Sequence, residues 1–202
     1  MRKGLLFLVF AISLAGVCRA QQKDLLIDDL EGAVSSGPEG TFDYGTGGGS
    51  LLELSASTEV KNSGGQSIKM TYDAIPGGYM WFARGLGLDA TNAAWLVKNT
   101  DIDWAKYSAI SLYVYGSDSK ATVAIDLKDS GNELWRYVVA DDFKGWKRFV
   151  LPFKGFRARD DWQPEGADTN LKLDFPLKTY QVEVLPEAKG VLYVDTIELT
   201  NS

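Results

Sequence analysis

The 202-residue sequence contains no histidine and a single cysteine. Without histidine, the chain cannot build a Ser-His-Asp or Cys-His nucleophilic system or a histidine-based metal site. The cysteine, Cys18, lies in an N-terminal segment that we expect to be removed, so the mature chain would have neither a disulfide nor a thiol nucleophile. Most familiar hydrolase mechanisms are therefore excluded. Without a disulfide, the stability of the mature chain must come from an apolar core.

Long apolar runs are scarce as well. The run over residues 4–17 follows Arg2 and Lys3 and is too short to span a bilayer, and Ala20 is a small residue suited to signal peptidase. We predict a signal peptide over residues 1–20, cleavage near Ala20, and a secreted or periplasmic mature chain. A lipoprotein anchored at Cys18 ranks second, because Val17 is a poor residue immediately before a lipidated cysteine.

Positive charge is in deficit, and no lysine-rich run occurs. The formal net charge is −6; without the three basic residues of the leader, 18 basic and 27 acidic residues remain, a formal charge of −9. Such a surface argues against nucleic acids and anionic membranes as partners and is compatible with a neutral ligand. Residues 21–202 are of a size that predicts one domain with its own core.

The mature chain is rich in short segments of branched and aromatic residues separated by glycine- and aspartate-containing turns. This pattern predicts an all-β fold, an antiparallel β-sandwich, with no amphipathic helix of useful length. The expected strands are residues 25–30, 51–60, 67–72, 79–84, 109–115, 122–127, 133–139, 147–151, 179–185 and 191–199.

Alternation along several strands predicts which side chains enter the core. Residues 110, 112 and 114 should face inward, as should residues 123, 125, 127, 180, 182 and 184, which leaves Tyr113, Tyr115, Gln181 and Glu183 pointing outward. The strand over residues 133–139 is ambiguous: either Trp135 and Tyr137 or their neighbours could face out.

Two segments interrupt the strand pattern. Residues 35–50 are rich in glycine and should form a flexible, poorly ordered surface loop; they lack the Lys-Ser/Thr ending of a phosphate-binding loop. Residues 86–104 read as a long crossover with helical character at residues 93–98, packing Trp95 and Trp104 over one end of the sandwich.

The most informative segment is residues 146–168, where an alternating strand leads into a loop with Arg157, Arg159, Asp160, Asp161 and Trp162. An aromatic ring can cover the apolar face of a pyranose while neighbouring charged groups pair with its hydroxyls. The loop therefore indicates sugar binding. The alternative is an exposed charged loop whose tryptophan caps the core.

Five motifs run through the mature chain in a fixed order: residues 27–32 (IDDLEG), 103–112 (DWAKYSAISL), 145–153 (GWKRFVLPF), 157–164 (RARDDWQP) and 193–199 (YVDTIEL). The most specific piece is the Arg-x-Asp-aromatic-Gln-Pro run at residues 159–164. In order and approximate spacing, these motifs resemble family 11 carbohydrate-binding modules, which belong to the galactose-binding-domain-like jelly rolls. The resemblance spans nearly the whole mature chain.

The resemblance implies binding of a β-glucan in an open cleft across one sheet, with Tyr79, Arg159, Asp161 and Trp162 at the matching positions. Near another cleft position of the family, this chain retains a hydrogen-bonding side chain in Asn132, and Asp129 is a further candidate. At two other positions it differs: Val184 stands where the family has a cleft tyrosine, and residues 178–179 stand where the family has an Asp-Ser pair. We add the outward residues Tyr113, Tyr115 and Gln181 as candidate ligand-binding residues.

The resemblance also implies a structural calcium ion where the first and last strands meet. Glu31 and Asp195 match the two clamping carboxylates, and Asp29 and a carbonyl from residues 63–69 are additional candidate ligands, consistent with the oxygen ligands that Ca²⁺ prefers. The alternative is that these acids lie on a solvated edge.

Three function classes follow. The leading one is a secreted, noncatalytic domain that binds a polysaccharide or oligosaccharide, with a hydrolase or an envelope assembly as a possible partner. An enzyme would need two carboxyl groups roughly 5–9.5 Å apart; Asp160, Asp161 and Glu165 are candidates, but Arg157 and Arg159 should keep them ionised. The third class is a structural or assembly protein of the cell envelope or flagellar sheath that uses the same sandwich.

Overall fold

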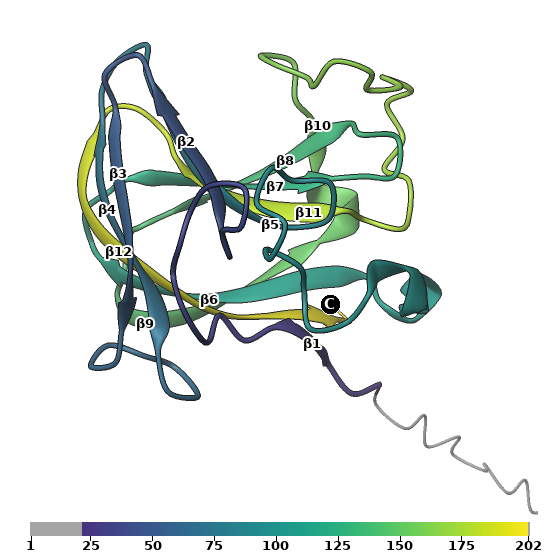
Figure 1. Cartoon of the computed structure of the whole chain (residues 1–202), viewed down its shortest axis with the longest axis horizontal. Helices are drawn as coiled ribbons and strands as arrows, with labels where there is room; N and C mark the ends of the chain where they lie inside the picture. The colour runs from purple at the N-terminus through teal and green to yellow at the C-terminus, as the bar shows by residue number, and fades with distance from the viewer. Residues whose placement is uncertain (1–21, 202) are drawn as a thin grey trace, which may run out of the picture.

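The computed structural model describes residues 22–201, so the predicted leader lies outside the described residues. The chain folds into two six-stranded antiparallel sheets. Figure 1 labels their strands. The predicted antiparallel β-sandwich is therefore confirmed. Within residues 22–201, no helix has both the length and the apolar character needed to cross a membrane.

The first sheet has the order β3-β4-β12-β6-β9, and β1 pairs with the far end of β12, beyond the end of β4. β12 is the longest strand, so β4 and β1 pair with successive parts of the same side of it, and β6 pairs with its other side. The strands are β1 (Leu25–Asp28), β3 (Leu51–Ser57), β4 (Ser67–Ala74), β6 (Ala109–Ser117), β9 (Lys144–Pro152) and β12 (Ala188–Thr200).

The second sheet has the order β10-β8-β7-β11-β5-β2. Its strands are β2 (Asp43–Gly47), β5 (Tyr79–Gly85), β7 (Thr122–Lys128), β8 (Leu134–Ala140), β10 (Arg157–Ala158) and β11 (Thr179–Val184). Three single-turn 3₁₀ helices lie in the connections: η1 (Asn99–Asp101), η2 (Trp104–Lys106) and η3 (Phe153–Gly155).

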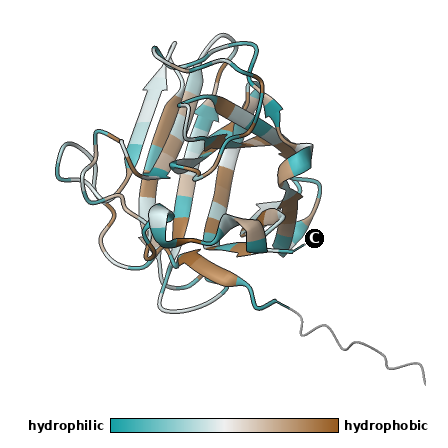
Figure 2. Cartoon of the chain, turned by 90° about the vertical axis from the view of Figure 1, so that its right-hand side faces the viewer, coloured by the Kyte–Doolittle hydropathy of each residue, from teal (hydrophilic) through white to brown (hydrophobic). Residues whose placement is uncertain are grey.

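The core lies between the sheets and follows the alternation of the sequence. The predicted inward residues of β6, β7 and β11 are all at most 2% exposed. Figure 2 shows the corresponding alternation of hydrophobic and hydrophilic bands along the strands. In the ambiguous strand β8, Tyr137 and Val139 pack against the core, so Arg136 and Val138 face outward.

One ionic cluster lies inside this apolar core. Asp28 of β1 accepts hydrogen bonds from Arg84 Nε at 2.5 Å and from the Tyr180 hydroxyl at 2.8 Å, and thereby connects the first sheet to the second. Burial raises the pKa of Asp28, and the neighbouring Arg84 opposes that rise. The cluster therefore ties the sheets together only while both charges are paired.

Two details of the prediction were wrong. The glycine-rich residues 35–50 contain the strand β2, which pairs with β5, instead of forming a loop throughout. Residues 93–98 form no helix; the first helical turn of the crossover is η1, immediately after them. The packing role of the crossover is confirmed, because Trp95 stacks on Tyr180 and Trp104 contacts Phe175.

Candidate functional site

The outward face of the second sheet gathers polar and aromatic side chains from neighbouring strands. Since Tyr180 and Val182 point into the core, Gln181 and Glu183 point away from it. The strand register places Gln181 beside Asp126, and Asp126 beside Arg136. Side chains from β11, β7 and β8 thus form a continuous polar row on this face.

Asp126 is the centre of an ionic network on the row. It is fully buried and accepts two hydrogen bonds of 2.8 Å from Arg136 and one of 3.0 Å from Arg159 Nη1. Arg136 also donates to Glu183. Charge-assisted, two-pronged pairs of this kind fix a guanidinium in one orientation, so the network forms a rigid floor.

Arg159 joins this floor to the loop that follows β10. Its Nε and Nη2 atoms donate to the two oxygens of Asp161 at 3.0 and 2.7 Å. The hydrogen bond from Arg159 holds the pKa of Asp161 below its ordinary value, while burial raises the pKa of Glu183. Asp161 is therefore an ionised hydrogen-bond acceptor at the surface.

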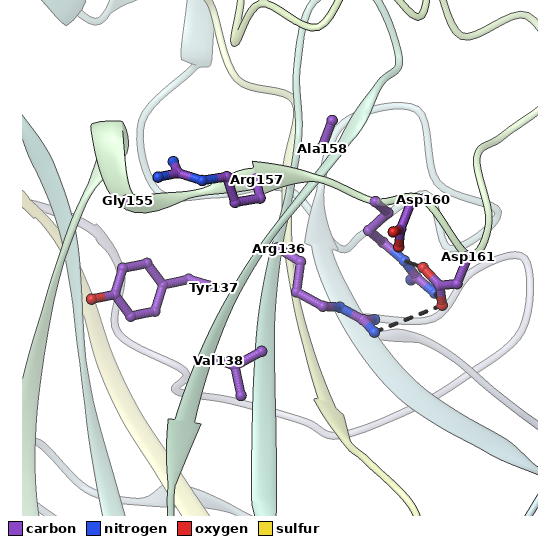
Figure 3. A pocket seen from close by; sticks show the side chains of 9 residues that line it. Arg136, Tyr137, Val138, Gly155, Arg157, Ala158, Asp160 and Asp161 are labelled. Atoms are coloured by element: carbon purple, nitrogen blue, oxygen red, sulfur yellow. Dashed lines mark hydrogen bonds and ion pairs between the residues drawn. The ribbon is translucent and has the colours of Figure 1, made fainter.

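The residues of this loop also line a hollow of about 600 Å³ beside the edge of the sheet. Figure 3 shows Arg136 extending toward Asp161, with Asp160 next to Asp161 and Arg157 directed to the other side. The lining residues are Arg136, Tyr137, Val138, Gly155, Arg157, Ala158, Arg159, Asp160 and Asp161.

Two aromatic side chains on this side of the molecule are exposed. Trp162 is 57% exposed and the centre of its ring lies 5.9 Å from the Arg159 guanidinium carbon, and Tyr79 of β5 is 51% exposed. A tryptophan that caps the core would be covered, so that alternative for Trp162 is wrong. Exposed rings beside fixed hydrogen-bonding groups can receive a ligand that has an apolar face and polar edges.

The loop is held in place by Gln163, whose role the sequence did not reveal. Its side-chain oxygen accepts from Leu134 N at 2.7 Å, and its Nε2 donates to the carbonyl oxygens of Leu134 and Arg159 at 3.0 and 2.9 Å. These contacts fix the backbone on both sides of Asp161 and Trp162. Alternation places Asp126 outward, opposite the core residues of its strand, but it does not indicate the pairing of Asp126 with two arginines.

The family described as "Carbohydrate binding domain (family 11)" matches residues 16–202. The chain belongs to carbohydrate-binding family 11. The resemblance of its five motifs to that family is thereby confirmed.

One enzyme is similar to this family 11 domain in sequence, and two solved modules share its fold. Endoglucanase H from Acetivibrio thermocellus is 25% identical over 169 residues, which make up 80% of this chain and 17% of that protein. A family 11 module from Clostridium thermocellum, in complex with a β-1,3-1,4-mixed-linked tetrasaccharide, has a TM-score of 0.67 at 24% identity. That match covers 89% of this chain and 96% of the module. A family 30 module of a cellulosomal cellulase from Clostridium thermocellum has a TM-score of 0.56 at 13% identity, covering 90% and 99%.

The family 11 domain does not bring all candidate residues together. Tyr113 and Tyr115 lie on β6 of the first sheet and alternate with the buried Leu112 and Val114, so they point away from the second sheet. Tyr115 instead contacts Trp146 and Tyr193 on that far face. Placing these two tyrosines in the site with Trp162 was therefore wrong.

The structure places the remaining candidates in different surroundings. Gln181 contacts Asp126 at 3.4 Å, and Asn132 lies in a turn where its side-chain oxygen accepts from Lys178 Nζ at 2.7 Å. Asp129 is fully buried and accepts from the Trp135 indole at 3.1 Å, so it holds the fold rather than facing a ligand. Val184, the position matched to a cleft tyrosine, lies in the core.

The carboxylates expected to hold calcium face backbone donors. Asp195 accepts from the N–H groups of Asn62 and Ser63 at 2.7 and 3.1 Å, and Glu31 accepts from that of Gly65 at 2.7 Å. No three acidic side chains among residues 22–201 are gathered into a group able to hold a metal ion. Both carboxylates therefore take part in a hydrogen-bonded closure of the strands, and calcium at this place stays a prediction that rests on the resemblance.

Proposed function

We propose that this family 11 domain binds a neutral β-glucan chain in an open cleft on the outward face of the second sheet and does not cleave it. The observation that carries the proposal is the placement of the exposed Trp162 ring next to the fixed Arg159–Asp161 pair. The family 11 module from Clostridium thermocellum in complex with a β-1,3-1,4-mixed-linked tetrasaccharide supports a β-glucan as the ligand.

The charges of the face favour binding over hydrolysis. A glycosidase needs one carboxyl group that is protonated and free to donate to the leaving oxygen. Asp161 is kept ionised by Arg159, and the buried carboxylates of Asp126 and Glu183 are paired with Arg136 and Arg159. The acids therefore act as hydrogen-bond acceptors and as anchors for the arginines.

The domain corresponds to 17% of Endoglucanase H, so the activity of that enzyme is not transferred to this chain. The predicted leader and the polysaccharide ligand together support a secreted or periplasmic location. A hydrolase acting on the same glycan is the partner that fits a binding domain of this kind, because holding the polymer raises the local concentration of its substrate.

Affinity electrophoresis of the mature protein tests the proposal. We expect retardation in gels that contain soluble mixed-linkage β-glucan, with xyloglucan and hydroxyethyl cellulose as comparisons and glycan-free gels as the control. The affinity should be weak to moderate, because few side chains are desolvated on an open face. Equal mobility in all gels would contradict binding, and release of reducing sugar by the pure protein would contradict the noncatalytic role.

A further inference from the structure

The glycine-rich strand β2 lies directly beside two aromatic residues of β5. The register pairs Gly45 with Trp81 and Gly47 with Tyr79. Met80 and Phe82 are buried, so Tyr79 and Trp81 project from the outward face, the same face that carries Gln181 and Glu183. The glycines thus occupy the edge of the face on which the proposed glucan lies.

The two glycines provide room for the two rings. A Cβ atom at Gly45 would lie 3.2 Å from Trp81 Cζ2, and one at Gly47 would overlap the Tyr79 ring. Neither glycine has a positive φ, so a left-handed backbone is not the reason for glycine here. The rings therefore lie against the bare backbone of β2 instead of meeting side chains from it.

Trp81 differs from the tryptophans that build the fold. Trp95, Trp104 and Trp135 each donate their indole N–H to a protein oxygen. Trp81 makes no such hydrogen bond to any residue between 22 and 201, and its side chain is only partly buried. An aromatic residue with a free donor at a polar surface is suited to a ligand that carries hydroxyl groups.

We infer that Trp81 is a further sugar-stacking residue. Together with Tyr79 it forms a second aromatic subsite, for another pyranose of the same glucan, and Gly45 and Gly47 leave the room that the two rings need. This inference rests on the proposed function. The centre of the Trp162 ring lies 5.9 Å from the guanidinium of Arg159, which pairs with Asp126 of β7, and β7 lies two strand spacings, roughly 10 Å, from β5. A ligand that contacts both Trp162 and Trp81 therefore has to be longer than a single sugar ring.

Trp81→Ala tests the subsite, with Trp146→Ala as the matched control. Trp146 is also a partly buried surface tryptophan, but it lies on the outward face of the first sheet against Tyr115. In gels with soluble mixed-linkage β-glucan, Trp81→Ala should weaken binding by roughly tenfold or more, and Trp146→Ala should leave it unchanged. Trp81→Tyr should retain most of the binding, because it keeps a stacking ring.

Gly45→Leu provides a second variant that retains the tryptophan. The new side chain would occupy the space in which the Trp81 ring lies and displace the ring, so binding should fall as in Trp81→Ala. If Trp81→Ala or Gly45→Leu binds like the wild type while melting normally, the inference is overturned and the proposed function stands. If the wild type itself is not retarded, the proposed function fails, and the inference fails with it.

Discussion

At the scale of single residues, exposure separates a tryptophan that serves a ligand from one that serves the fold. Trp162 is 57% exposed, so Trp162→Ala should change the free energy of unfolding by no more than about 0.5 kcal/mol and remove most β-glucan binding. Trp95 is 9% exposed and stacks on Tyr180, so Trp95→Ala should cost about 3–5 kcal/mol. Thermal melts and affinity gels of the two variants check both expectations. A large loss of stability in Trp162→Ala would remove the centre of the proposed site.

At the scale of strands, sequence patterns predicted the central elements and missed the edges of one sheet. The alternation of apolar residues identified β5, β7, β8 and β11, because those strands bury one face against the core. The missed strands, β2 and β10, are the two outermost strands of the second sheet. Their pairing is set by the neighbouring strand rather than by their own apolar residues, and glycine or charge in them resembles a loop.

The same limit explains what was predicted of the site. The motif over residues 159–164 pointed to Arg159, Asp161 and Trp162, because its residues are close in sequence. The partners of Arg159 come from β7 and β11, and a pairing between distant strands leaves no local signature. For the same reason, alternation could place Tyr113 outward but could not tell on which sheet.

The ionic floor that joins these strands makes its own prediction. Asp126 is fully buried and pairs with both Arg136 and Arg159, so Asp126→Ala would leave two largely buried guanidinium groups with Glu183 as the buried carboxylate that they still share. We expect a loss of about 3–5 kcal/mol in the free energy of unfolding, together with weaker glucan binding. Asp160→Ala, at an exposed position in the adjoining loop, is the control and should have little effect on stability. Urea melts followed by tryptophan fluorescence measure the difference, and equal stability of the two variants would contradict a structural role for the network.

At the scale of the whole molecule, the two ends of the chain meet in the first sheet. β1 pairs with β12, and Asp195 of β12 reaches the loop between β3 and β4, 133 residues away along the sequence from Asn62. The family motifs predicted that Glu31 and Asp195 lie where the two ends of the chain meet. The hydrogen bonds from the loop to the carboxylates could not be predicted, because backbone N–H groups carry no sequence signal.

The final prediction concerns what closes the sandwich at this point. Asp195 is fully buried and accepts two backbone N–H groups and the Thr196 hydroxyl, and a hydrogen bond to a charged group contributes about 1.5–3 kcal/mol. If these hydrogen bonds alone close the sandwich, Asp195→Ala should lower the melting temperature clearly, with and without a chelator, and the chelator alone should leave the wild type unchanged. If a calcium ion closes the sandwich instead, the chelator should lower the melting temperature of the wild type and hardly affect Asp195→Ala. The reason is that a cation bound only to the native state contributes RT ln(1 + [L]/Kd) to stability. Melting curves of the two proteins with and without chelator decide between direct hydrogen bonding and a metal ion.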